Sequence, residues 1–296
     1  MTRQPHDRFA KQYLEELLSS LGTVEISKEI TDETRQIDIF FSPNPDRAID
    51  PDRLGILGKI ARNTALIEPY RNSPTRSEVR DCLLKLFTVF AESKRQAKRE
   101  NTAYNEENLP SLWILAPSAS PALLEGFNAK LKEDWLEGIY FFPPFLRTAI
   151  VAINRLPDIP ETLWLRLLGR GSTQDRAVRE LLTLQRDDSL RQNVLELLVS
   201  WRVSVEIQNK LDEEDREVFM TLSQVYLEWK EATKQEGQQE GQRSMIENLL
   251  RVRFGELDET LDRVVNALLE LSPAESSRLL LESSREELID RFDRAG

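Results

Sequence analysis

Residues 36–41, Gln36-Ile37-Asp38-Ile39-Phe40-Phe41, place one carboxylate inside an otherwise apolar, strand-like run. A second run, Ala65-Leu66-Ile67-Glu68, ends on another carboxylate and is stopped by Pro69. Strand alternation puts Glu68 on the face of Leu66, away from Ile67. Because burial of two unpaired carboxylates is costly, the two runs together predict a shared partner for Asp38 and Glu68.

The segments on either side of these runs alternate between helical and extended patterns. We expect helices over 7–21, 52–62 and 77–99, and strands over 24–30, 36–42, 64–68, 111–116, 138–142 and 148–153. Helix, strand, strand, loop, strand, long helix, strand is the order of a restriction-endonuclease-like core. The pattern therefore predicts an α/β fold with a mixed sheet flanked by helices.

The rest of the chain reads as helical. We expect the α/β core over 1–160, an all-helical extension over 161–234 and a small helical C-terminal module over 243–296. Between them, residues 235–242 are the tetrapeptide Gln-Glu-Gly-Gln written twice. Each internal glycine costs a helix about 1 kcal/mol relative to alanine, so this segment is predicted to be a linker. In the module, Ser284-Arg285-Glu286-Glu287 has the pattern of a helix capping box.

Composition excludes several classes of site. The 296 residues include one histidine and one cysteine, so multi-histidine zinc sites, internal disulfides and a serine protease triad within the core lack their parts. His6 is expected to be a frayed or capping residue near the terminus, and Cys82 a packing residue. No glycine-rich phosphate loop is present, which argues against an organic nucleotide cofactor.

The chain shows no targeting or membrane signal. No apolar run approaches the ~20 residues that span a bilayer, and the first residues lack the apolar segment of a signal peptide. With a single cysteine, a reducing compartment is expected. We therefore expect a cytoplasmic protein without a membrane partner.

The net charge of −11 is concentrated in the tail. Residues 1–204 hold 28 Lys and Arg against 29 Asp and Glu, whereas residues 205–296 hold 12 against 22. The first two thirds of the chain are nearly neutral and can present a local basic face to DNA.

Asp38 and Glu68 are the candidate metal ligands. Two strand-borne carboxylates suit Mg²⁺, or Mn²⁺ in its place, because a hard cation takes oxygen ligands and keeps waters for hydrolysis. Glu16, at the edge of the apolar face of the first helix, is the candidate assisting acid. The structural alternative is a pair of surface or ion-paired carboxylates, with Arg35 and Arg71 near in sequence.

Four segments resemble one family of nucleases. They are Phe9-Ala10-Lys11, Arg35-Gln36-Ile37-Asp38-Ile39-Phe40, Leu66-Ile67-Glu68-Pro69-Tyr70-Arg71-Asn72 and Leu163-Trp164-Leu165-Arg166-Leu167-Leu168-Gly169. Over roughly residues 6–233 the chain resembles the Rpn family, the recombination-promoting nucleases, also known as PD-(D/E)XK nuclease-family transposases. The tail, with Glu247-Asn248-Leu249-Leu250-Arg251-Val252-Arg253-Phe254-Gly255, is similar to a domain of unknown function that often follows such nucleases in cyanobacterial proteins.

The resemblance implies a metal-dependent DNA endonuclease, with Asp38 and Glu68 matching the ligand positions. The family motif has a lysine two residues after the second acid, where this chain has Tyr70. Arg71 is adjacent, and Lys59 or Lys85 could supply the cation from a neighbouring helix.

Three functions remain open on the sequence. The first is Mg²⁺-dependent hydrolysis of DNA, associated with recombination or transposition, with Asp38, Glu68, Arg71 and Glu16 as its site residues. The second is a catalytically inactive DNA-binding or protein-interaction relic of the same fold. The third is a scaffold that forms homo-oligomers through the tail and needs no site.

Overall fold

The computed structural model of the chain describes residues 5–30, 35–46, 50–185, 188–207, 216, 218–223, 227, 242–243, 246–247, 249–251, 254, 258–271 and 273–293. It divides into two compact units, Met1–Ser223 and Gln224–Gly296. Most of the predicted linker, residues 235–241, lies outside the described residues, as do residues 208–215 and 228–234 of the predicted helical extension.

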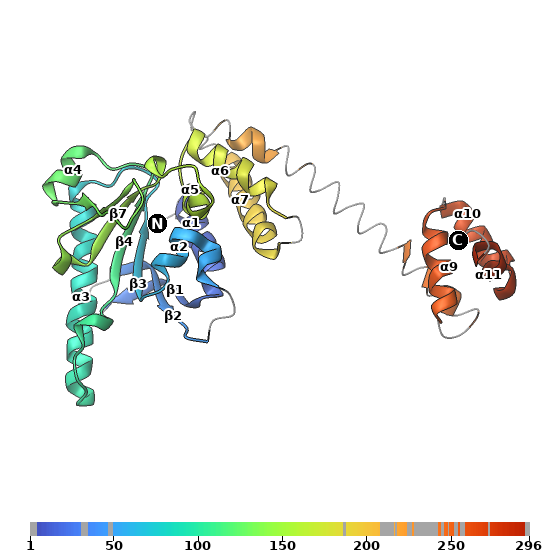
Figure 1. Ribbon diagram of the computed structural model, residues 1–296, viewed down its shortest axis with the longest axis horizontal. Helices are drawn as coiled ribbons and strands as arrows, with labels where there is room; N and C mark the ends of the chain where they lie inside the picture. The colour runs from blue at the N-terminus through green and yellow to red at the C-terminus, as the bar shows by residue number, and fades with distance from the viewer. Residues whose placement is uncertain are drawn as a thin grey trace. The chain divides into compact units, whose positions relative to one another are not determined.

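The first unit combines one sheet with helices on both faces (Figure 1). Its strands are β1 (Gly22–Ile30), β2 (Arg35–Pro43), β3 (Ala65–Pro69), β4 (Ser111–Ala116), β5 (Lys130–Leu131), β6 (Ile139–Phe141) and β7 (Thr148–Ala152). Its α-helices are α1 (Pro5–Ser19), α2 (Gly55–Ile60), α3 (Arg76–Glu100), α4 (Pro121–Gly126), α5 (Leu163–Arg166), α6 (Ser172–Thr183) and α7 (Ser189–Ile207). The α/β class expected from the sequence is confirmed.

The sheet is mixed, with strand order β1-β2-β3-β4-β7-β6-β5. Strands β3, β4 and β7 are parallel neighbours, and every other pairing is antiparallel. The parallel strands therefore end at the same edge of the sheet, where open α/β sheets commonly bind ligands. β5 and α4 were not expected from the sequence, because each is short and lacks a clear periodic pattern.

Two hydrophobic layers cover the sheet, and they explain why the strands at its centre are apolar on both faces. On one face, α1, α2 and α5 pack against Ile39, Ile67 and Trp113. On the other, α3 and α4 pack against Leu66, Leu112 and Ile114. The Glu68 side chain falls on the α3 face, as predicted from its alternation with Leu66.

The long helix α3 has strong local signals at both ends. Thr75 and Glu78 form a reciprocal capping box at its start, and Asn101 ends it in the left-handed conformation at φ 55°. Its inner side chains are Val79, Cys82 and Leu86. Because Cys82 faces the sheet, the residue one helical turn after it also faces the sheet.

The helices that follow the sheet share its core. Leu165, Val194 and Trp201 belong to the same hydrophobic cluster as Phe9 of α1, and the Trp201 ring stacks on Phe9 at 5.0 Å between centroids. Trp113, Trp164 and Trp201 are all buried.

The expectation for His6 is wrong. Its side chain is only 7% exposed and its ring lies 6.3 Å from that of Phe9 and 6.2 Å from that of Trp201. α1 begins at Pro5, one residue before the histidine, and α7 covers its first turn. A contact with a helix nearly two hundred residues later leaves no trace in the local sequence pattern.

The second unit contains α9 (Glu259–Leu269), α10 (Pro273–Glu282) and α11 (Arg285–Asp293) around a small core of its own. The predicted capping box is confirmed: the backbone N–H of Ser284 donates to Glu287 at 2.8 Å, and that of Glu287 donates to the Ser284 hydroxyl at 3.3 Å. Among the described residues of both units, no helix is long and apolar enough to cross a membrane.

Candidate metal centre between two strands

Glu68 lies near the carboxyl end of β3 and is almost fully buried, at 1% exposure. The β2–β3 ladder pairs Ile39 with Ile67, so the next residues along it, Asp38 and Glu68, stand opposite each other. The backbone N–H of Asp38 donates to Oε1 of Glu68 at 3.3 Å. Adjacent strands thus bring together the two carboxylates that the sequence singled out.

A lysine accompanies each carboxylate. Lys85 of α3 donates from Nζ to Oε2 of Glu68 at 2.7 Å, and Lys11 of α1 lies 2.5 Å from Oδ1 of Asp38. Both lysine side chains are largely buried, at 17% and 8% exposure. Lys11 also lies 3.3 Å from Asp7, one helical turn earlier. We call Lys11, Asp38, Glu68 and Lys85 the carboxylate–lysine cluster.

Of the three candidate cationic side chains that the sequence left open, Lys85 is the one that contacts Glu68. It is one helical turn after Cys82, so the phase of α3 aims it at the sheet. The other two candidates lie elsewhere: Lys59 donates to the carbonyl of Asp134 at 3.0 Å, and the Arg71 guanidinium lies 5.6 Å from the ring centre of Trp201.

The predicted assisting acid, Glu16, has a different partner. Its Oε1 accepts a hydrogen bond from the Asn193 amide of α7 at 2.6 Å, and within the described part of the chain no contact links it to Asp38 or Glu68. The acid of α1 nearest the cluster is Asp7, held through Lys11. Sequence reasoning missed Lys11 as a site residue, although it stands in the Phe9-Ala10-Lys11 segment, because a lysine on an amphipathic helix is ordinarily solvated.

The electrostatics of Glu68 are unusual. Burial raises the pKa of its carboxyl from 4.5 to about 7; the Lys85 ammonium opposes that shift and the Asp38 carboxylate adds to it. For Lys85, burial alone would lower the pKa, but the Glu68 carboxylate raises it overall. Each of the two groups therefore favours the charged form of the other in a low-dielectric site. Ionisable groups with strongly shifted pKa values are enriched at functional sites.

Tyr70 stands where the family motif has a lysine, and it forms a neutral pair with Cys82. The Tyr70 hydroxyl lies 3.1 Å from the sulfur of Cys82, one helical turn before Lys85. Burial raises the pKa of the Cys82 thiol to about 12, with the Glu68 carboxylate adding to the shift. A thiol with so high a pKa stays protonated, so Cys82 is no nucleophile.

Asp38 and Glu68 are the donor set that a divalent cation would use. The described residues contain no group of three His, Cys, Asp or Glu side chains that would hold a metal. They do offer two opposed carboxylates, and Asp38 is 24% exposed with Lys11 on only one of its oxygens. Since Mg²⁺ usually keeps several waters and takes only one or two protein carboxylates, Asp38 and Glu68 are chemically sufficient ligands.

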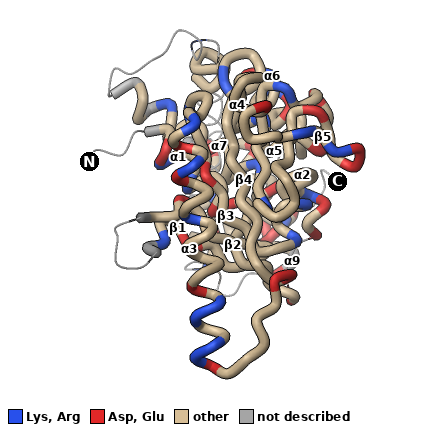
Figure 2. The backbone as a smooth tube through the Cα atoms, turned by 90° about the vertical axis from the view of Figure 1, so that its left-hand side faces the viewer, with Lys and Arg blue, Asp and Glu red and all other residues tan. Residues whose placement is uncertain are grey.

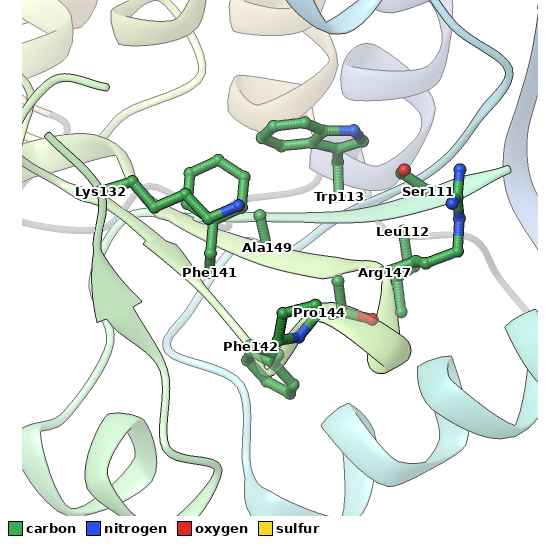
Figure 3. A pocket seen from close by; sticks show the side chains of 10 residues that line it. Ser111, Leu112, Trp113, Lys132, Phe141, Phe142, Pro144, Arg147 and Ala149 are labelled. Carbon is green, nitrogen blue, oxygen red and sulfur yellow. The ribbon is translucent and has the colours of Figure 1, made fainter. Parts of the chain in front are cut away.

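A separate small cavity of about 230 Å³ lies beside the N-terminal ends of β4 and β7 (Figure 3). Its walls include the Trp113 and Phe141 rings, the latter with the Lys132 ammonium 4.2 Å from its centre. Because β3, β4 and β7 are parallel, this cavity lies at the end of the sheet opposite to Glu68. No member of the carboxylate–lysine cluster lines it.

Comparison with known proteins adds no family: no family model, no curated protein and no solved structure matches this chain.

Proposed function

We propose that the first unit is a Mg²⁺- or Mn²⁺-dependent DNA endonuclease of the PD-(D/E)XK type, with a restriction-endonuclease-like core. The observation that carries this proposal is that Glu68 contacts both the backbone of Asp38, on the adjacent strand, and the ammonium of Lys85, on a helix. Two acids and one lysine are the chemical set of such a nuclease, and here the lysine comes from α3 instead of the motif position at Tyr70.

In the proposed reaction a water oxygen forms a new bond to phosphorus and gives its proton to the solvent. The bond from phosphorus to a sugar oxygen breaks, and that oxygen takes a proton from the solvent. A bound divalent cation, held by Asp38 and Glu68, would supply Lewis-acid activation of the phosphate. Lys85 stabilises the negative charge that develops there, and its ammonium partly offsets the burial that disfavours the ionised form of Glu68. Lys11 fixes the Asp38 side chain through its ion pair.

Charge distribution supports DNA as the substrate. Lys94, Arg95, Lys98 and Arg99 are exposed at the end of α3, and Figure 2 shows basic positions gathered where this helix extends beyond the sheet. The second unit belongs to the acidic tail and would repel phosphates. Duplex binding is therefore expected from the first unit, through contacts that weaken as salt increases.

The deciding experiment is incubation of the purified full-length chain with plasmid DNA and Mg²⁺ or Mn²⁺. Cleavage is expected with either cation, and not in EDTA or in the Asp38→Ala variant. Lys85→Gln should lower the rate about 10²-fold, the usual cost of one group that stabilises transition-state charge. Lys59→Gln, a lysine of α2 outside the cluster, is the matched control and should leave the rate unchanged.

The alternative is a binding-only relic of the fold. Two observations favour it: tyrosine occupies the motif position, and both carboxylates already have lysine partners in the described residues. Duplex binding that persists in Asp38→Ala, together with no metal-dependent cleavage by the unmodified chain, would replace the nuclease proposal with this one.

A further inference from the structure

A second group of polar side chains lies near the same edge of the sheet as the carboxylate–lysine cluster. His6 comes from the first turn of α1, Arg71 from the segment directly after β3, and Arg170 from the segment directly after α5. The carboxylate–lysine cluster uses none of these three side chains. Arg71 follows Glu68 by three residues and comes after the end of β3, at the carboxyl edge of the parallel strands.

His6 carries a buried polar atom that a ligand could satisfy. Its side chain is more than nine-tenths buried, and no hydrogen-bond partner of its Nε2 atom is found among the described residues. Leaving a buried polar atom unsatisfied is unfavourable, because the atom has lost its hydrogen bonds to water. The acid beside it in sequence, Asp7, is paired with Lys11 instead.

The two arginines lie close enough to act on this histidine. Burial, together with the charges of Arg71 and Arg170, lowers the pKa of His6 to about 3. The imidazole is therefore neutral, and it lies within the positive field of two guanidinium groups.

Both arginines are held in place by their surroundings. Arg170 donates from Nη1 to the Asn72 side chain at 2.8 Å, and its backbone N–H donates to Asn154 at 3.1 Å. The Arg71 guanidinium lies over the Trp201 ring. Pre-positioned guanidinium groups suit phosphate, because their planar fork matches its oxygen atoms.

We propose that His6, Arg71 and Arg170 form a subsite for a phosphate group. A phosphate would bring negative charge to the two arginines and accept the hydrogen bond that a neutral imidazole can donate from Nε2. Its identification as a DNA backbone phosphate next to the cleaved one rests on the proposed function; phosphate binding itself does not.

The single histidine gives a direct probe. In a ¹⁵N-labelled full-length chain, the imidazole nitrogens of His6 are the only histidine signals. Inorganic phosphate, added in EDTA against chloride at equal ionic strength, should shift them in a saturable way. Arg170→Gln should weaken phosphate binding about tenfold, the loss of one charge-assisted contact, and Arg170→Lys less. Arg62→Gln, an exposed arginine paired with Asp52, is the matched control and should bind as the unmodified chain does.

The outcomes of these titrations test the phosphate subsite separately from the proposed nuclease activity. No saturable shift of the His6 signals up to about 50 mM phosphate, a range that covers weak millimolar affinities, would overturn the subsite. An equal shift in Arg170→Gln would overturn the role of that arginine. A short duplex in EDTA should shift the same signals; a shift with phosphate but not with the duplex would keep the anion site and overturn its assignment to DNA. None of these titrations depends on metal or on cleavage, so an inactive protein leaves the result intact.

Discussion

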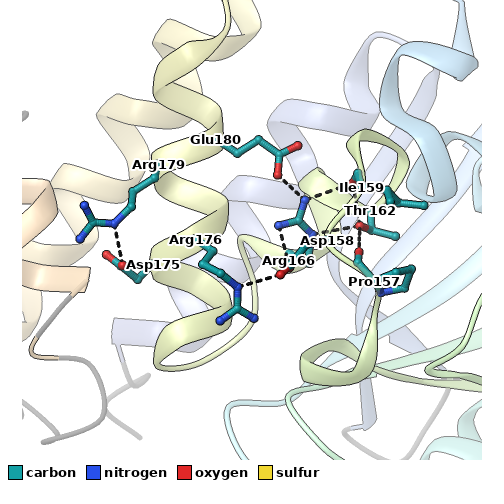
Figure 4. A network of polar contacts seen from close by, with 9 residues as sticks. All are labelled: Pro157, Asp158, Ile159, Thr162, Arg166, Asp175, Arg176, Arg179 and Glu180. Atoms are coloured by element: carbon teal, nitrogen blue, oxygen red, sulfur yellow. Dashed lines mark hydrogen bonds and ion pairs between the residues drawn. The ribbon is translucent and has the colours of Figure 1, made fainter.

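Two buried ionic groups in the first unit differ in how completely they are satisfied. Around Arg166, which is fully buried, the guanidinium donates to Thr162, Asp158, Ile159 and Glu180 at 2.5–3.3 Å (Figure 4). In the carboxylate–lysine cluster, Glu68 is buried with a pKa raised to about 7, and Asp38 keeps an exposed oxygen. The Arg166 network links α5 to α6. In the carboxylate–lysine cluster, burial disfavours the ionised form of Glu68.

The two groups show that a buried charge can either stabilise the fold or leave a group ready to react. A guanidinium whose donors all have acceptors behaves as part of the scaffold, because the hydrogen bonds offset its desolvation. A carboxylate whose ionised form is penalised is poised to change its proton or gain a cation. Substitutions in the first group should therefore affect stability, and those in the second should affect activity.

The largest expected effect is on cleavage by the cluster. Asp38→Asn should lower metal-dependent cleavage about 10³-fold, as loss of a group that stabilises the transition state typically does. Its free energy of unfolding in EDTA should change little, since Asp38 is partly exposed and the substitution nearly preserves its shape. Urea unfolding and plasmid cleavage on the same sample measure both. A large loss of stability would assign Asp38 to the scaffold.

The next effect concerns the Arg166 network. Arg166→Ala should lower the free energy of unfolding by about 3 kcal/mol, because it removes a fully buried side chain together with its ion pairs and hydrogen bonds. Arg176, half exposed and bound to the same Asp158 at 2.8 Å, is the matched control: Arg176→Ala should cost less than about 1 kcal/mol. Equal costs for the two variants would show that burial does not distinguish these contacts.

The pH dependence of stability should reveal Glu68. Its pKa is raised in the folded protein from 4.5 to about 7, so folding favours the protonated form. This contribution is complete below about pH 4.5 and is lost as the pH rises through about 7. Glu68→Gln should therefore flatten the stability profile between these limits in EDTA, whereas Glu25→Gln, an exposed acid paired with Lys28, should not. An unchanged slope in Glu68→Gln would contradict the assignment.

The smallest effect is expected at the motif position. Tyr70→Phe removes the hydroxyl that lies 3.1 Å from Cys82 and should lower the free energy of unfolding by about 1 kcal/mol. Cleavage should be unaffected, because Lys85 supplies the cation. A strong loss of cleavage would make the Tyr70 hydroxyl part of the chemistry.

The sequence by itself determined the α/β class, most strands of the sheet, and the pair Asp38 and Glu68. These follow from short-range patterns: period-two alternation places Glu68 on the face of Leu66, and a capping box from Ser284 to Glu287 marks the start of α11. A carboxylate in an apolar strand is visible in the sequence because it violates the pattern around it.

Only the tertiary structure decided which side chains complete the site. Lys11 and Lys85 lie on opposite faces of the sheet, and each looks like an ordinary solvated lysine until its helix is packed. Glu16 was expected at the cluster but is bound by Asn193 of α7, and His6 was expected to fray but is buried by the same helix. The rotation of α1 and α3 against the sheet is set by packing over long sequence separations, which local periodicity does not encode.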